Sequence, residues 1–170
     1  MQEQKGAVTF QGAPLTLVGD LAGVGSAAKD FTLLDNGLNP VSLGDYTGKV
    51  VVLVTVPSLD TPVCDKESRR FIHEAESFGD GVELVIASMD LPFAQARWSA
   101  DAGVSVNTLS AHSDTAFAED YGVLVKELRL LARAVFIIDR AGKVGYVQLV
   151  KEITEEPDYD AVLAGLAGIA

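Results

Sequence analysis

The chain has 170 residues, of which 48% are hydrophobic, and its 24 acidic against 13 basic residues give a formal net charge of −11. This length and composition favour one folded domain over residues 1–170 and exclude disordered and fibrous classes. The acidic field repels phosphate backbones and anionic lipid surfaces, so we expect neither nucleic acid nor a membrane as a partner.

The first third of the chain predicts β-structure. Two short β-like runs, residues 8–10 and 15–17, flank a turn and predict an N-terminal β-hairpin. After a glycine-rich loop, residues 30–34 and 41–43 are expected to be short extended pieces near an edge of a sheet. Residues 49–56 form a β-branched run without alternation, which is typical of a central strand buried on both faces.

Helical and strand patterns then alternate. Apolar spacing predicts a helix from residue 62 that ends before the glycines at 79–81, and a second helix over residues 90–102. Buried strands are expected at residues 82–88 and, more briefly, at 108–110.

The last third predicts a hairpin between two helices. A short helix at residues 114–121 and a loop at 122–131 precede two strands, residues 132–139 and 143–150, and a final helix covers 158–166. Parallel strand-helix-strand units followed by an antiparallel hairpin predict the α/β class, as a thioredoxin-like mixed sheet flanked by helices on both faces.

The most informative segment joins the predicted central strand to the next helix and ends at the only cysteine, Cys64. A single cysteine excludes an internal disulfide and a Cys-x-x-Cys redox pair. Unpaired N–H groups and the helix dipole favour an anion there, and a thiolate is a nucleophile. The hydroxyl of Thr61, one turn earlier, can hydrogen-bond an oxygen-containing substrate, while Pro57 stiffens the loop. Alternatively, Cys64 is a packed apolar thiol.

The segment has the form Pro-x-x-x-Thr-x-x-Cys, which resembles the active-site signature of the peroxiredoxins, thiol-dependent peroxidases with a thioredoxin-like fold. The resemblance narrows to the thiol peroxidase (Tpx) subfamily through the N-terminal hairpin and the stretches 90–95, 132–136 and 152–159. It implies that Cys64 is the peroxidatic cysteine and becomes sulfenic acid, that Thr61 orients the peroxide and that Pro57 shields the pocket.

The same resemblance makes Arg133 the arginine that stabilises the thiolate and the leaving oxygen. An arginine keeps its charge and offers five donors in a rigid fork. Arg133 also interrupts an apolar segment, so we expect it to have a buried or pocket partner rather than to lie on the surface.

One position departs from the Tpx pattern. The subfamily usually has a resolving cysteine in the second predicted helix, where this chain has Ser99. A serine hydroxyl cannot form a disulfide with a sulfenic acid. Either the protein is a natural one-cysteine enzyme whose sulfenic acid is resolved by an external thiol, or serine replaces a native cysteine.

The leading hypothesis is a cytoplasmic thiol peroxidase that reduces hydrogen peroxide and organic hydroperoxides without a metal, flavin or haem. The cytoplasm is expected because residues 1–5 lack the features of a secretory signal. The resemblance implies thioredoxin or another thiol as reductant and a homodimer. We expect Phe93 and Trp98 to be exposed apolar side chains that suit the dimer surface. The histidines, His73 and His112, are not expected to act in catalysis.

Two rivals remain. A thioredoxin-like binding module would have a structural, slowly alkylated Cys64. A thiol transferase is disfavoured because the chain has no Cys-x-x-Cys pair.

The acidic residues between 152 and 160 lack the spacing of a calcium loop and are expected to be a solvated segment that caps the last helix.

Overall fold

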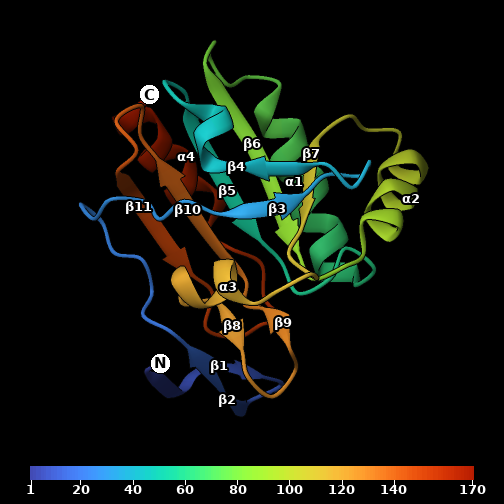
Figure 1. The fold of residues 1–170 in the computed structure, drawn as a ribbon, viewed down its shortest axis with the longest axis vertical. Helices are drawn as coiled ribbons and strands as arrows, with labels where there is room; N and C mark the ends of the chain where they lie inside the picture. Colours follow the sequence, from blue (N-terminus) through green and yellow to red (C-terminus); the bar gives the residue numbers. More distant parts are fainter.

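The computed structural model describes residues 1–170 and is built around a seven-stranded sheet (Figure 1). Its strands are β3 (Thr32–Leu34), β4 (Pro40–Ser42), β5 (Val50–Thr55), β6 (Val82–Ser88), β7 (Asn107–Ser110), β10 (Ala134–Ile138) and β11 (Val144–Leu149). Their spatial order is β11-β10-β5-β6-β7-β3-β4, with β5, β6 and β7 parallel and β10 antiparallel to both of its neighbours. The predicted mixed α/β sheet is therefore confirmed, with β5 in its interior and β3 and β4 at one edge.

A second sheet forms at the end of the molecule where the N-terminus lies (Figure 1). It consists of β1 (Glu3–Phe10), β2 (Ala13–Val18), β8 (Leu124–Val125) and β9 (Leu130–Leu131). The predicted hairpin is confirmed as β1 and β2. The loop predicted at residues 122–131 is wrong in part, because it contains β8 and β9, whose two-residue strands are too short to show a periodic pattern.

Four α-helices cover the large sheet: α1 (Pro62–Ala75), α2 (Pro92–Ala102), α3 (Ala116–Asp120) and α4 (Tyr159–Ile169), and a 3-10 helix, η1 (Leu43–Tyr46), follows β4. A proline opens α1 and α2, where its missing N–H costs no hydrogen bond. The side chain of Asp158 caps α4 by accepting a hydrogen bond from the Ala161 N–H at 3.0 Å, as the sequence predicted for this acidic segment.

The two faces of β5 lie in two separate apolar cores. Val52 and Val54 belong to a core that includes residues of α1, α2 and α4. Val51 and Leu53 face the other core, which is shared with α3 and the small sheet. Both faces of β5 are buried, as its unbroken β-branched run predicted.

The expectation that Phe93 and Trp98 are both exposed is wrong for Trp98. Phe93 is 65% exposed, but Trp98 is only 6% exposed and its Nε1 donates a hydrogen bond to the Asp65 carboxylate at 2.9 Å. The buried face of α2 contains Pro92, Gln95 and Trp98. No helix of the structure is both long enough and apolar enough to cross a membrane.

Candidate active site

Cys64 lies in the first turn of α1, directly beyond the carboxyl end of β5. Thr61 is the extended residue before the helix and Pro62 is its first residue, so the helix starts where the sequence predicted. The Cys64 side chain is 0% exposed and belongs to the core that α1 shares with the even-numbered valines of β5. A reactant therefore reaches the sulfur only when neighbouring side chains move.

Arg133 lies in the two-residue connection between β9 and β10 and contacts Cys64. The arginine is 1% exposed, and its Nη2 donates a hydrogen bond to the Cys64 Sγ at 3.4 Å. Its Nε and Nη2 both donate to the Ile153 carbonyl, at 3.2 Å and 2.8 Å, and its Nη1 donates to the Glu67 carboxylate. The expectation that Arg133 has buried partners is confirmed. Of its five N–H donors, one on Nη1 has no acceptor from the protein.

The partner of this arginine, Glu67, follows Cys64 by three residues on α1 and is fully buried. Burial raises the pKa of Glu67 to about 7, although the positive charge of Arg133 opposes that shift. Burial lowers the pKa of Arg133, but attraction to Glu67 and Cys64 outweighs it, so the net shift is upward. Arg133 thus keeps its charge, and Glu67 is the member of the pair that takes up a proton near neutral pH.

Thr61 and Pro57 lie in the loop that leads to Cys64. Pro57 is buried, while Thr61 is half-buried. The Thr61 hydroxyl donates to the carbonyl of Ser58 at 3.0 Å and does not cap α1. A hydroxyl oxygen in this arrangement still has lone pairs for a second partner, and rotation about its C–O bond would aim the proton at a substrate.

Asp90 lies between β6 and α2, two residues after β6 ends, and holds the loop that leads to Cys64. Its carboxylate accepts hydrogen bonds from the Ser58 hydroxyl at 2.7 Å, the Leu59 N–H at 2.8 Å and the Ser88 hydroxyl at 2.8 Å. In the sequence, Asp90 stands out only as the first residue of the stretch 90–95 that resembles the Tpx subfamily. Nothing in the sequence shows that its carboxylate binds a loop about thirty residues earlier, since that contact depends on β5 and β6 being neighbours.

Ser99 lies on α2, and its hydroxyl oxygen is buried without a hydrogen-bond partner. No hydrogen bond joins it to Cys64. A buried hydroxyl without a partner costs free energy, whereas a thiol at the same place would lose little because it is a weak donor and acceptor.

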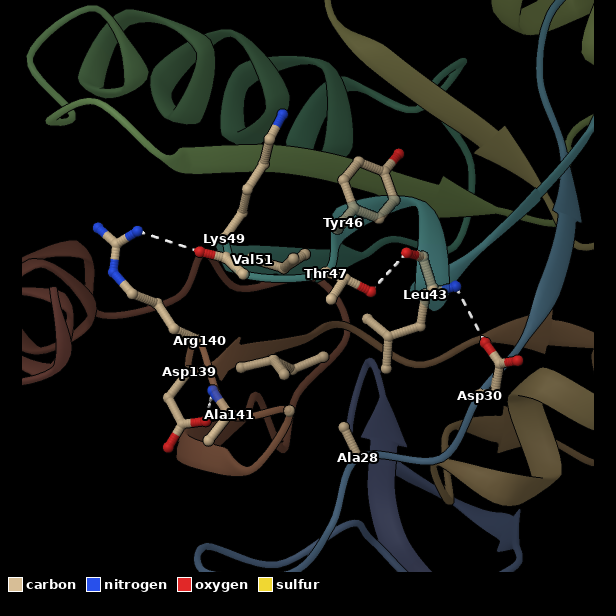
Figure 2. A pocket seen from close by; sticks show the side chains of 14 residues that line it. Ala28, Asp30, Leu43, Tyr46, Thr47, Lys49, Val51, Asp139, Arg140 and Ala141 are labelled. Atoms are coloured by element: carbon tan, nitrogen blue, oxygen red, sulfur yellow. Dashed lines mark hydrogen bonds between the residues drawn. The ribbon is translucent and has the colours of Figure 1, made fainter.

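A separate pocket lies at the other end of β5 and is shown in Figure 2. The polar groups around it are already engaged: Asp30 accepts a hydrogen bond from the Leu43 N–H at 3.1 Å, and Arg140 donates to the Gly48 carbonyl at 3.1 Å. Lys49 pairs with Glu83 at 2.6 Å. These groups do not converge on a common point, so we place no chemistry there.

The remaining candidates from the sequence lie away from Cys64. His73 faces solvent, and His112 is exposed with its Nδ1 2.9 Å from the Ser110 hydroxyl oxygen. No three metal-ligating side chains gather into a group that could hold a metal ion. The acidic segment after β11 is only partly solvated as predicted, because Glu152 accepts several hydrogen bonds from the N-terminal hairpin.

Comparison with known proteins decides the family. A family model described as Redoxin matches residues 23–163. The chain belongs to the redoxin family. This redoxin is 52% identical to the thiol peroxidase of Staphylococcus aureus (strain MRSA252) over 163 residues, which cover 95% of this chain and 98% of that protein. It is 51% identical to the thiol peroxidase of Bacillus subtilis (strain 168) over 154 residues, which cover 90% and 92%.

Solved structures agree with the fold. A peroxiredoxin-like protein from Aquifex aeolicus superposes on this redoxin with a TM-score of 0.87 and 42% identity, covering 98% of this chain and 99% of that one. The thiol peroxidase from Chromobacterium violaceum gives a TM-score of 0.84 with 23% identity over 99% and 98% of the two chains, which supports the fold alone. The predicted thioredoxin-like fold and the resemblance to the thiol peroxidase group are thereby confirmed.

Proposed function

We propose that this redoxin is a thiol peroxidase that reduces hydrogen peroxide and organic hydroperoxides at Cys64. The observation that carries the proposal is the buried hydrogen bond from the Arg133 guanidinium to the only sulfur nucleophile of the chain, at the start of a helix. A cation and the unpaired N–H groups of a helix terminus both favour the thiolate. Its relatives of about half identity are named thiol peroxidases.

The proposed chemistry is a displacement at oxygen. The Cys64 thiolate attacks one peroxide oxygen, an S–O bond forms as the O–O bond breaks, and the sulfur becomes sulfenic acid. The departing oxygen takes up a proton and leaves as water or an alcohol. Arg133 faces the charge that develops on this oxygen, because one of its Nη1 protons has no acceptor from the protein. Thr61 would turn its hydroxyl from the Ser58 carbonyl to the peroxide.

The sulfenic acid then needs a thiol from another molecule, because the chain has no second cysteine. That thiol attacks the Cys64 sulfur, water leaves and a mixed disulfide forms, which a second thiol reduces. Thioredoxin or another thiol reductant fits this role. Since Cys64 is fully buried, the side chains around it must move before the external thiol can reach the sulfur.

Ser99 stands, in this proposal, where a resolving cysteine would lie. Its buried hydroxyl without a hydrogen-bond partner supports a position suited to sulfur rather than to oxygen. The two explanations of the serine, a natural one-cysteine enzyme and a replaced cysteine, make the same prediction for this chain: the sulfenic acid persists until an outside thiol arrives.

We also propose that residues 1–170 act as one domain, that the protein works in the cytoplasm, and that it forms a homodimer. A core that includes residues of both sheets, such as Val8 and Leu53, supports the single domain. The dimer surface would include the start of α2, where Leu91 is 51% and Phe93 is 65% exposed. No metal, flavin or haem is needed for the proposed displacement.

The rival function is a binding module with a structural thiol, and the complete burial of Cys64 is the observation in its favour. Peroxide consumption in a single turnover separates the two. The reduced protein should consume one equivalent of hydrogen peroxide for each Cys64, and the Cys64→Ser variant none. A protein that consumes no peroxide and is alkylated no faster than a free cysteine would be the binding module.

A further inference from the structure

The carboxylate of Glu152, in the segment between β11 and α4, accepts five hydrogen bonds. Three come from the N-terminal hairpin: the Thr9 hydroxyl at 2.7 Å, the Gln11 N–H at 2.9 Å and the Gly12 N–H at 3.0 Å. The other two come from the N–H and hydroxyl of Thr154, at 3.2 Å and 2.7 Å. These donors, the Thr9 hydroxyl first, hold the pKa of Glu152 well below its usual range.

The main chain reinforces this attachment of the segment to the hairpin. The Thr9 N–H donates to the Lys151 carbonyl at 2.6 Å, and the Ile153 N–H donates to the Thr9 carbonyl at 2.8 Å. Thr9 and Glu152 thus form a parallel bridge between β1 and the segment. The Ile153 side chain, 6% exposed, lies in the core that the hairpin shares.

The carbonyl of Ile153 is the acceptor that faces Arg133. It takes hydrogen bonds from the arginine Nε at 3.2 Å and Nη2 at 2.8 Å, and the same Nη2 donates its second proton to the Cys64 Sγ. Because the guanidinium is a rigid plane, the position of this carbonyl fixes where the remaining N–H donors point. A displacement of Ile153 therefore moves the guanidinium relative to the sulfur.

We propose that Glu152 is a positioning residue for Arg133, and that the N-terminal hairpin sets the geometry at Cys64 through it. The inference rests on the proposed function, since it takes Arg133 to act on the Cys64 sulfur. A carboxylate suits this position because all five surrounding groups donate their hydrogen bonds to the side-chain oxygens of residue 152. A glutamine would turn an NH₂ group toward some of them and lose those bonds.

The test is a double-mutant cycle on the rate at which hydrogen peroxide oxidises Cys64. Quenched-flow sampling with intact-mass detection measures this rate. Glu152→Gln should slow this step by about tenfold, within the range of couplings seen in contact networks. Glu155→Gln is the matched control, because Glu155 is exposed in the same segment and its side chain makes no hydrogen bond. In an Arg133→Lys background, which keeps a cation beside Glu67 but loses the rigid fork, the effect of Glu152→Gln should fall below about twofold.

Each result decides the inference. A Glu152→Gln rate equal to that of the control, or an equal loss in both backgrounds, would overturn it, because Glu152 would then act independently of Arg133. If Glu152→Gln does not fold, Thr9→Val removes one donor in nearly the same shape and should give a smaller loss with the same dependence on Arg133. A wild-type protein whose Cys64 is not oxidised at all would refute the proposed function itself, a result distinct from the others.

Discussion

Arg133 and Glu67 form a buried ion pair against the Cys64 sulfur, with exposed fractions of 1% and 0%. Removing one member of such a pair usually destabilises a protein because the other charge stays buried. Here Glu67 has its pKa raised to about 7 by burial, even with Arg133 beside it. It can therefore take up a proton when the arginine is removed, which lets the fold survive that substitution.

Arg133→Ala is accordingly expected to leave a folded protein with a much slower peroxide step. A preorganised donor at a developing charge contributes on the order of 3 to 4 kcal/mol, or about 10² to 10³ in rate. Circular dichroism would check the fold, and quenched-flow oxidation of Cys64 the rate, with Lys5→Ala as a control at an exposed cation on β1. An unchanged rate would contradict the role assigned to Arg133.

The raised pKa of Glu67 also predicts a pH dependence of stability. At a pH between the ordinary glutamate pKa of 4.5 and the folded-state pKa of about 7, the native carboxyl of Glu67 holds a proton that the unfolded chain has released. The free energy of unfolding from this group therefore falls as pH rises through that window and is constant above it, a change of a few kcal/mol at most. Urea unfolding of Glu67→Gln should lack this decline, and a decline of equal size in the variant would contradict the assignment.

The sequence singled out Cys64, Thr61, Pro57 and Arg133 as candidates because three of them lie in one short motif and the fourth interrupts an apolar run. It missed Glu67. A glutamate in the middle of an amphipathic helix normally faces solvent. The ion pair with Arg133, 66 residues away in the chain, offsets the free-energy cost of burying Glu67.

At the scale of elements, the long strands and helices were predictable and the shortest strands were not. The buried face of α2 was not predictable either, because it contains a polar residue. Gln95 is fully buried since its amide donates to the Ser88 hydroxyl and the Leu109 carbonyl, both at 3.0 Å. A hydrophobic pattern cannot show that a glutamine has such partners, which come from β6 and β7.

A further prediction concerns Ser99, which lies on α2 at the position expected for a resolving cysteine. In a Ser99→Cys variant, one equivalent of peroxide should produce an internal disulfide with Cys64, seen as the loss of two hydrogens in the intact mass of protein denatured without a reductant. Ala100→Cys, at an exposed position on the same helix, is the matched control and should give less of this bond. Equal disulfide yields in the two variants would argue against Ser99 as the resolving position.

At the scale of the whole molecule, the net charge of −11 and the exposed start of α2 bear on association. A dimer must bury enough apolar surface to offset the repulsion between two acidic chains. Sedimentation at moderate salt should give twice the chain mass of 17.9 kDa, and Phe93→Ser should shift the protein toward the monomer. A wild-type chain that sediments as a monomer at all concentrations would refute the dimer.

The central claim is that Cys64 reacts with peroxide to give a sulfenic acid that nothing within the chain resolves. The most direct measurement is intact mass of the reduced protein before and after one equivalent of hydrogen peroxide, with dimedone present to trap sulfenic acid and Cys64→Ser as the control. We predict rapid labelling that depends on Cys64. An unlabelled protein with its thiol still free would contradict the account and leave the binding module as the better description.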